Sequence, residues 1–236
     1  MSNHYFKFKQ FTVHQDKCAM KVGTDGVLLG AWADVSGVKR ILDIGTGTGL
    51  IALMLAQRSQ ASIDAVEIEV NAFEQAQENV ICSPWRKRIN VLHADFWDFS
   101  EIQTEKYDLI VSNPPYFNNS LKAPLKERSM ARHNDGLLPS KLLVGVVKIL
   151  SLDGRFCVIL PYVESQLFIV DAVMHGLYCV QKVNIIPAPH KKANRVLMTF
   201  SRTRQKNMES ELLIRDGEGE YSEDYKKLTS EFYLFF

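Results

Sequence analysis

The sequence predicts an α/β fold in which a mostly parallel sheet of seven strands, one of them reversed, is covered by helices on both faces. From residue 41 onward, short runs rich in β-branched and aromatic residues alternate with helical patterns, and this alternation is typical of β-α-β units. The last two predicted strands are joined only by residues 187–194 (PAPHKKAN). Because a parallel return needs a crossover of about a dozen residues or more, this pair must be antiparallel.

Each element follows from its local pattern. Predicted strands span 41–44, 62–66, 89–93, 107–112, 155–160, 177–186 and 195–202. Predicted helices span 49–58, 70–81, 138–150 and 163–175. Residues 117–137 form a long insertion without clean periodicity, and such insertions in compact domains are usually functional lids or mobile segments. Residues 221–236 (YSEDYKKLTSEFYLFF) are expected to form a helix whose aromatic end docks on the body.

The length of 236 residues fits one large domain, which we divide into an entry segment (1–40), a catalytic core (41–202) and a C-terminal extension (203–236). The net charge is only +1, but the charges are segregated. Residues 182–206 carry seven basic side chains and no acid, whereas residues 209–235 carry eight acids and three bases. The basic segment would suit a polyanionic partner, and the alternative is a merely solvated surface.

Several classes of protein are disfavoured by the composition. The four cysteines form no C-x-x-C pair, which favours reduced thiols over disulfides or zinc, and the six histidines lack ligand spacing, so we expect no metal. The start MSNHYFKFKQ lacks the apolar core of a signal peptide, and no uncharged apolar run approaches the ~18 residues that span a bilayer. We therefore expect a soluble, cytoplasmic protein that acts as a monomer without membrane contact.

A glycine-rich turn follows the first predicted strand. The stretch LDIGTGTG supplies Asp43, Gly45, Gly47 and Gly49 directly before a helix. Glycines let the backbone approach a ligand closely, and the helix N-terminus offers free N–H groups. The next strand ends in Glu67, twenty residues past Gly47, where a carboxylate can accept hydrogen bonds from ribose hydroxyls. The combination predicts a nucleoside cofactor, although the glycines could merely form a tight turn beside a surface acid.

The identity of that cofactor is indicated by the acid before the glycines. The pattern is G-x-G-x-G rather than the G-x-G-x-x-G of dinucleotide enzymes, and it follows Asp43. An anion there would repel a pyrophosphate but suit the ammonium of an amino-acid moiety, which favours S-adenosylmethionine over NAD. Asp95 ends the third strand and would accept from the adenine amine, or else cap a helix. Together with Asn113, these strand ends fall on one edge of the sheet, where ligands bind in open α/β folds.

The stretch SNPPY (112–116) follows the fourth strand. Its prolines lock the backbone in an extended shape and remove N–H donors, which leaves the Asn113 side-chain oxygen and the Pro114 carbonyl as acceptors beside the Tyr116 ring. Two acceptors and a flat ring suit a planar –NH₂ group, whose lone pair would then face an electrophilic methyl. The alternative is a rigid proline turn in which Tyr116 only packs.

With these motifs, residues 5–202 resemble the class I S-adenosylmethionine-dependent methyltransferases that carry N-P-P-[YF], and the segment 6–32 is most similar to the bacterial tRNA1(Val) adenine-N6 methyltransferase family. The resemblance implies a Rossmann-like fold and methylation of the tRNA adenine adjacent to the anticodon on its 3′ side. It also implies that Lys21, Gly23, Thr24 and Asp25 border the methionine end of the cofactor, with Asn113 nearby. Thr24 or Asp25 could instead be the N-cap of a helix over 26–33.

The N-P-P-Y motif alone does not fix the substrate, because it also serves methylases of DNA or rRNA adenine, guanine N2 and release-factor glutamine. Only about 40 residues precede the glycine loop, which leaves no room for the helical domain of a release-factor methylase, and a separate DNA-recognition domain has no space either. RNA is therefore favoured. A nucleotide- or RNA-binding protein without catalysis is the alternative of another class.

Predicted RNA contacts come from two loops at the active-site edge. If the strand 177–186 runs parallel to the others, the following loop brings its basic residues there, and the insertion adds more. The residues expected to grip an anticodon arm are Lys122, Lys126, Arg128, Arg132, His133, Lys191, Lys192 and Arg195. Phe117 would wall the pocket of the target base or be part of the core.

Overall fold

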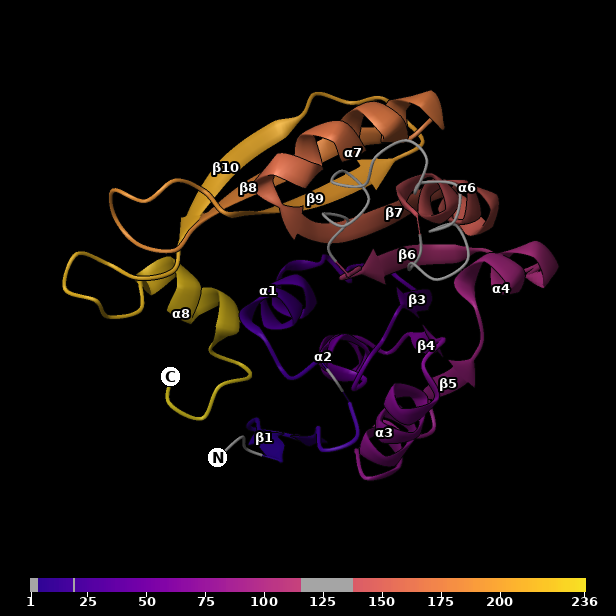
Figure 1. Cartoon of the computed structure of the whole chain (residues 1–236), viewed down its shortest axis with the longest axis horizontal. Coiled ribbons are helices and arrows are strands. Elements are labelled where there is room, and N and C mark those ends of the chain that lie inside the picture. Colours follow the sequence, from indigo (N-terminus) through magenta and orange to yellow (C-terminus); the bar gives the residue numbers. More distant parts are fainter. Residues whose placement is uncertain (1–3, 19, 116–137) are drawn as a thin grey trace, which may run out of the picture.

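A computed structural model describes residues 4–18, 20–115 and 138–236, and an eight-stranded sheet runs through its centre (Figure 1). The strand order is β10-β8-β9-β7-β6-β3-β4-β5. The strands are β3 (Arg40–Ile44), β4 (Ser62–Glu67), β5 (Ile89–His93), β6 (Tyr107–Ser112), β7 (Leu150–Pro161), β8 (Tyr178–Ile186), β9 (Arg195–Ser201) and β10 (Met208–Leu213).

The sheet confirms the predicted topology and adds one strand. Strand β9 pairs antiparallel with both β7 and β8, whereas all other pairs in this sheet are parallel. All seven predicted strands are present. The prediction missed β10, which joins the edge of the sheet parallel to β8. Its sequence MESELL gave little signal because Leu212 is its one buried side chain.

The helices cover both faces of this sheet, and a small hairpin precedes them. The helices are α1 (Thr24–Trp32), α2 (Leu50–Arg58), α3 (Val70–Ile81), α4 (Phe96–Ile102), α6 (Pro139–Ile149), α7 (Tyr162–Met174) and α8 (Glu223–Thr229). The hairpin consists of β1 (Tyr5–Lys7) and β2 (Thr12–His14), which pair antiparallel. Neither this hairpin nor α4 was predicted, since both are too short to show a hydrophobic period. The N-cap of α1 is Gly23, so Thr24 and Asp25 are not caps but lie in the first turn.

Two hydrophobic cores lie on opposite faces of the sheet. One packs beneath α1 and α2 and includes the N-terminal hairpin, and the other packs beneath α4, α6 and α7. The aromatic C-terminal end closes the first core, as expected: Tyr233 stacks on Phe8 with ring centroids 5.9 Å apart, and Lys9 N–H donates to the Phe232 carbonyl at 2.8 Å. Burial of these aromatic side chains stabilises the link between the entry segment and the C-terminal extension.

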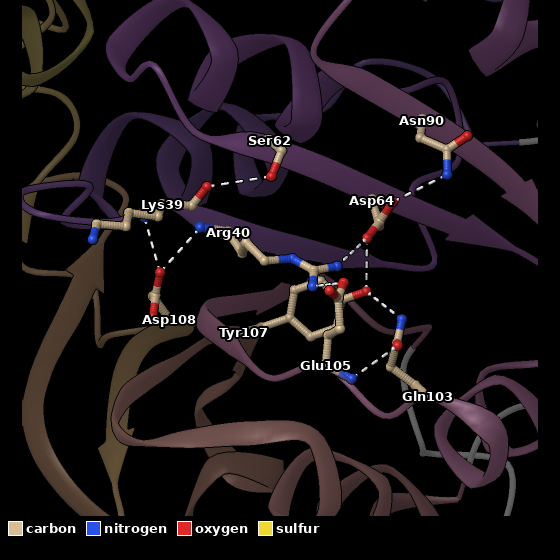
Figure 2. Close-up of polar contacts among 9 residues, drawn as sticks. All are labelled: Lys39, Arg40, Ser62, Asp64, Asn90, Gln103, Glu105, Tyr107 and Asp108. Atoms are coloured by element: carbon tan, nitrogen blue, oxygen red, sulfur yellow. Dashed lines mark hydrogen bonds and ion pairs between the residues drawn. The ribbon is translucent and has the colours of Figure 1, made fainter.

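A polar network ties together the amino ends of the central strands (Figure 2). The buried Tyr107 hydroxyl of β6 donates to Asp64 Oδ2 of β4 at 2.7 Å and accepts from Gln103 Nε2 at 2.9 Å. Arg40 of β3 pairs with both Asp64 and Glu105, and its guanidinium carbon lies 5.0 Å from the Tyr107 ring centroid. Burial, and then the Asp64 acceptor, raise the pKa of Tyr107. The network fixes β3, β4 and β6 relative to one another.

Removing the Tyr107 hydroxyl should lower stability without affecting ligand binding. We expect Tyr107→Phe to reduce the free energy of unfolding by about 1–2 kcal/mol, because the substitution removes two hydrogen bonds and leaves Asp64 less satisfied. Denaturant unfolding measures the change. Tyr178→Phe is the control, since the Tyr178 hydroxyl bonds to no other described residue. Equal stability of the Tyr107→Phe variant and the wild type would contradict a stabilising network.

Candidate active site

A cavity of about 930 Å³ opens at the carboxyl edge of the parallel strands, within the size range of small-molecule sites. It brings the predicted strand ends together. Its described lining comes from the ends of β3 (44–48), β4 (66–69) and β6 (112–115) together with the loops that follow them, from the loop after β5 (94–97), and from residues 20–26 around the start of α1. The remaining lining residues are Cys18, Leu50, Ile51, Ala72, Lys141 and Arg195.

The glycines of the loop after β3 serve two different purposes. Gly45 and Gly47 line the cavity at φ +68° and +57°, and a Cβ on either would meet no atom within 4 Å. Positive φ favours glycine, and the missing side chains leave open space for a ligand. Gly49, at φ +81°, does not line the cavity: a Cβ there would lie 3.5 Å from Ala76 of α3. That distance is ordinary van der Waals contact, so glycine is favoured at this position by the left-handed backbone of the α2 N-cap rather than by lack of space, and contact of Gly49 with the cofactor stays a prediction.

Glu67 is held at the cavity wall by backbone donors. Its Oε2 accepts from Gly47 N–H at 2.8 Å, and its Oε1 accepts from the N–H groups of Ile68 and Glu69, both at 2.9 Å. A carboxylate oxygen can accept two hydrogen bonds, and Oε2 uses one for Gly47. The side chain therefore presents a fixed acceptor beside the glycine loop, as a ribose hydroxyl requires.

Asp43 lies behind the glycine loop, not on the cavity wall where the sequence had placed it. The side chain is completely buried, and its Oδ2 accepts from Thr46 Oγ1 at 2.6 Å and from Ala52 N–H at 3.2 Å. Its Oδ1 has no hydrogen-bond partner among the described residues. Burial raises the pKa of Asp43 to about 7, and the charge of Glu67 adds to this effect. A cation or donor in the cavity would favour the ionised carboxylate.

This raised pKa makes stability depend on pH in a defined direction. Asp43 in the folded protein holds its proton above the unfolded value of 3.8, so its contribution to stability is complete at low pH and falls as pH rises to about 7. Between pH 4.5 and 7.5, we expect the free energy of unfolding of the wild type to fall relative to that of Asp43→Asn by roughly 3 kcal/mol. Parallel pH profiles by denaturant unfolding would contradict the raised pKa.

Asp95 has one of the two roles that the sequence left open, that of a helix cap, and its contact with an adenine amine stays a prediction. It is the N-cap of α4, where its Oδ1 accepts from the N–H groups of Trp97 and Asp98 at 2.7 and 3.4 Å, and it also lines the cavity. The next residues, Phe96 and Trp97, line the cavity too. Sequence reasoning missed both, although an aromatic pair directly after a strand-end acid is a usable signal for a ring-binding wall.

The proline corner after β6 faces the cavity. Ser112 Oγ donates to the Ile44 carbonyl at 3.0 Å, which attaches the end of β6 to β3. Asn113 and Pro114 line the cavity, and the Asn113 carboxamide makes no hydrogen bond with another described residue. Its oxygen is thus available to a ligand. Seven predicted site residues lie outside the described residues, namely Tyr116, Phe117, Lys122, Lys126, Arg128, Arg132 and His133.

Residues from distant parts of the chain complete the rim. Lys21, Gly23, Thr24 and Asp25 line the cavity, and Arg195 Nε of β9 donates to Asp25 Oδ2 at 2.8 Å. The sequence had assigned Arg195 to RNA phosphates, but its guanidinium is engaged at the cavity wall by the Asp25 carboxylate. Lys141 of α6, which was not predicted, also lines the cavity, with its Nζ 5.7 Å from the Trp97 ring centroid.

The basic segment 182–206 does not form one patch, contrary to the expectation from sequence. Lys182 is buried and pairs with Glu209 at 2.9 Å, and Arg202 donates to the carbonyls of Val147 and Leu150. Because β9 is reversed, residues 202–206 emerge at the opposite edge of the sheet. Lys191 and Lys192 are exposed in the loop between β8 and β9, at the cavity edge.

In residues 4–18, 20–115 and 138–236, no group of three or more His, Cys, Asp or Glu side chains is arranged to hold a metal ion. Within the same ranges, no helix is both long and apolar enough to cross a bilayer.

The strand order with β9 reversed, the glycine loop and Glu67 define a class I S-adenosylmethionine-dependent methyltransferase. The model of the methyltransferase small domain matches residues 23–140. The chain belongs to the family of tRNA1(Val) (adenine(37)-N6)-methyltransferases. A member from Bacteroides thetaiotaomicron is 51% identical over 99% of both chains, and one from Photorhabdus laumondii is 46% identical over 98% of this chain and 96% of its own.

Solved structures support the fold alone. A predicted O-methyltransferase from Agrobacterium tumefaciens superposes with a TM-score of 0.66 over 88% of this chain and 96% of its own, at 20% identity. A likeness at this level of identity carries no information about the substrate, because one fold hosts many chemistries.

Proposed function

We propose that the protein transfers the methyl group of S-adenosylmethionine to the exocyclic N6 of a tRNA adenine, the one adjacent to the anticodon on its 3′ side. The observation that carries this proposal is the position of Asn113 and Pro114, whose acceptors share one cavity with the glycine loop and Glu67. The relatives that match along their whole length bear names that specify this reaction.

The cavity fits the cofactor. Its wall offers open space above the backbone of Gly45 and Gly47 and a fixed acceptor at Glu67. Behind the loop, Asp43 Oδ1 has no hydrogen-bond partner among the described residues, and a nearby ammonium would favour the ionised form of this carboxyl group. In the proposed arrangement, Asp95 accepts from the adenine amine, and the methionine end lies against the segment containing Lys21, Gly23, Thr24 and Asp25. When bound, the cofactor supplies an electrophilic methyl group.

The proline corner orients the nucleophile. The Asn113 side-chain oxygen and the Pro114 carbonyl accept hydrogen bonds from the two N–H groups of the target amine. The nitrogen lone pair is thereby directed away from these two oxygens and into the cavity. These acceptors also stabilise the positive charge that develops on nitrogen, and the extra proton then leaves without a strong base. Tyr116, outside the described residues, is proposed to stack on the base.

The loop between β8 and β9 would hold the RNA backbone through Lys191 and Lys192. Affinity for tRNA falls as salt rises, so the slope of log affinity against log salt is negative. We expect the double variant Lys191→Ala/Lys192→Ala to reduce the magnitude of this slope by about 1.5, because two phosphate contacts are lost. The matched control is Arg204→Ala/Lys206→Ala, two exposed cations at the opposite edge of the sheet. Binding assays at several salt concentrations measure both, and equal slopes for the two double variants would refute this role.

Methyl transfer from labelled cofactor tests the proposed function. An unmodified tRNA transcript with adenine next to the anticodon should accept the label, and a transcript with guanine at that position should not. Equal labelling of the two transcripts would point to another nitrogen in RNA. Label in protein would point to a glutamine methylase. No label at all would point to a binding protein without catalysis. Action on tRNA would place the protein in the cytoplasm.

A further inference from the structure

An arginine–aspartate pair ties each end of helix α1 to the central sheet. At the carboxyl edge of the parallel strands, Arg195 Nε of β9 donates to Asp25 Oδ2 in the first turn of α1 at 2.8 Å. At the opposite edge, Arg155 Nη1 of β7 pairs with Asp34 Oδ2, just after α1, also at 2.8 Å. Asp25 and Arg195 both line the cavity, whereas Asp34 and Arg155 do not. The two pairs are thus alike in chemistry and length, but only one of them lies at the ligand site.

The cavity wall before α1 is held by contacts from elsewhere in the chain. Gly23, the N-cap of α1, is extended and gives the helix no side-chain cap, and the residues just before it form neither helix nor strand. Val22 N–H donates to Gln15 Oε1 at 2.8 Å, and Asp25 accepts from Arg195 of the central sheet. The ion pair therefore attaches this wall to β9.

The body of α1 is fixed separately, by close packing on α2. A Cβ on Gly26 would lie 3.0 Å from Leu50, and one on Gly30 would lie 2.8 Å from Met54. The buried side chains of α1 also share a core with those of β7 and β9. Packing leaves the helix little freedom, so the part whose position depends on the ion pair is the first turn and the chain before it.

We propose that Arg195 is a positioning residue for the cofactor: by pairing with Asp25, it holds the wall segment 20–26 in the shape that receives the methionine end of S-adenosylmethionine. This inference rests on the proposed function, which places the methionine end against that segment. Arg195 Nη1 also donates to the Asn194 carbonyl at 2.9 Å, so the guanidinium is oriented by two acceptors. The paired side chains are only 25% and 20% exposed, which protects the pair from screening by salt.

The guanidinium also balances charge in the cavity wall. Glu67, Glu69 and Asp95 line the same cavity. Without Arg195, Asp25 would add an unpaired and partly buried carboxylate to these acids, which is unfavourable. The wall segment would relax to bring this carboxylate into water. Cofactor binding would then have to restore the shape of the wall, and the affinity would fall.

Calorimetric titration of S-adenosylmethionine into the full chain tests the proposal. Arg195→Gln should weaken binding by about tenfold, and Arg195→Lys, which keeps the charge, should lose less. Arg155→Gln is the matched control, because it breaks an equally short pair at the other end of α1. It should lower stability, measured by denaturant unfolding, and keep the cofactor affinity of the wild type. Equal losses of affinity in Arg155→Gln and Arg195→Gln would reduce the role of Arg195 to general stability and overturn the proposal.

A double-mutant cycle distinguishes positioning from direct contact with the cofactor. If the two side chains act as one pair, Asp25→Asn and Arg195→Gln weaken binding to similar extents, and the double variant binds no more weakly than either. Losses that multiply in the double variant would indicate two independent contacts with the cofactor and would overturn the proposal.

Binding of tRNA separates this role from a phosphate contact. Arg195→Gln should keep the wild-type dependence of tRNA affinity on salt, unlike Lys191→Ala/Lys192→Ala. A weaker salt dependence together with unchanged cofactor affinity would make Arg195 an RNA contact and refute the inference. A wild type that binds no S-adenosylmethionine would overturn the proposed function as well. A wild type that binds it only as tightly as Arg195→Gln would overturn this inference alone.

Discussion

Replacing Asn113 by alanine is expected to lower methyl transfer by about a thousandfold or more, because the target amine loses the acceptor that orients its lone pair and stabilises its developing charge. Cofactor binding should change little, since the glycine loop and Glu67 form a separate part of the cavity. Single-turnover transfer and calorimetric titration of S-adenosylmethionine measure the two effects separately.

Two further variants sharpen this prediction. Asn207→Ala removes an exposed carboxamide between β9 and β10, at the opposite edge of the sheet, and should retain full activity. Asn113→Asp keeps the shape and the acceptor oxygens, so it should retain more activity than Asn113→Ala. If Asn113→Ala lost cofactor binding and transfer in equal measure, the residue would be structural and the account of the proline corner would fail.

The second large effect is expected at Gly47. Gly47→Ala should weaken cofactor binding by about a hundredfold, because its backbone is left-handed and the new Cβ points into the cavity. It would also disturb the N–H group that holds Glu67. Calorimetric titration of the cofactor measures the loss.

Gly37→Ala is the control that distinguishes two possible effects of Gly47→Ala, strain in a left-handed backbone and loss of open space for the cofactor. Gly37 has a φ of +71° and equally open space around its Cβ position, but it lies in an exposed turn before β3 and away from the cavity. Both variants should lose about 1–2 kcal/mol of stability from the left-handed backbone, and only Gly47→Ala should lose cofactor affinity. Equal affinities of the two variants would show that Gly47 has no role in the cavity.

The parts of the site that could be predicted from sequence are those set by local backbone chemistry. Positive-φ glycines, a strand-end acid and a double proline leave signatures within a few residues, and parallel topology then brings their strand ends to one edge. Loop length likewise determined that β9 is reversed. The position of Asp43 behind the loop could not be predicted, because its burial depends on how α2 packs.

The features that escaped prediction depend on tertiary contacts or on weak local signals. The pair of Asp25 and Arg195 joins residues 170 positions apart, and Lys141 reaches Trp97 from another helix. Strand β10 has almost no buried face, so its pattern could not reveal it. The exposure of several aliphatic side chains on α7 could not be predicted either, because a helix that is apolar on both faces is expected from its sequence to be part of the core.

The most direct test of the central claim is mass spectrometry of nucleosides from unmodified tRNA incubated with the protein and labelled S-adenosylmethionine. The proposed clamp on an exocyclic amine predicts a single labelled product, N6-methyladenosine, located next to the anticodon on its 3′ side. Label on a base carbon, on a ribose oxygen or on guanine N2, with none on adenine N6, would contradict it.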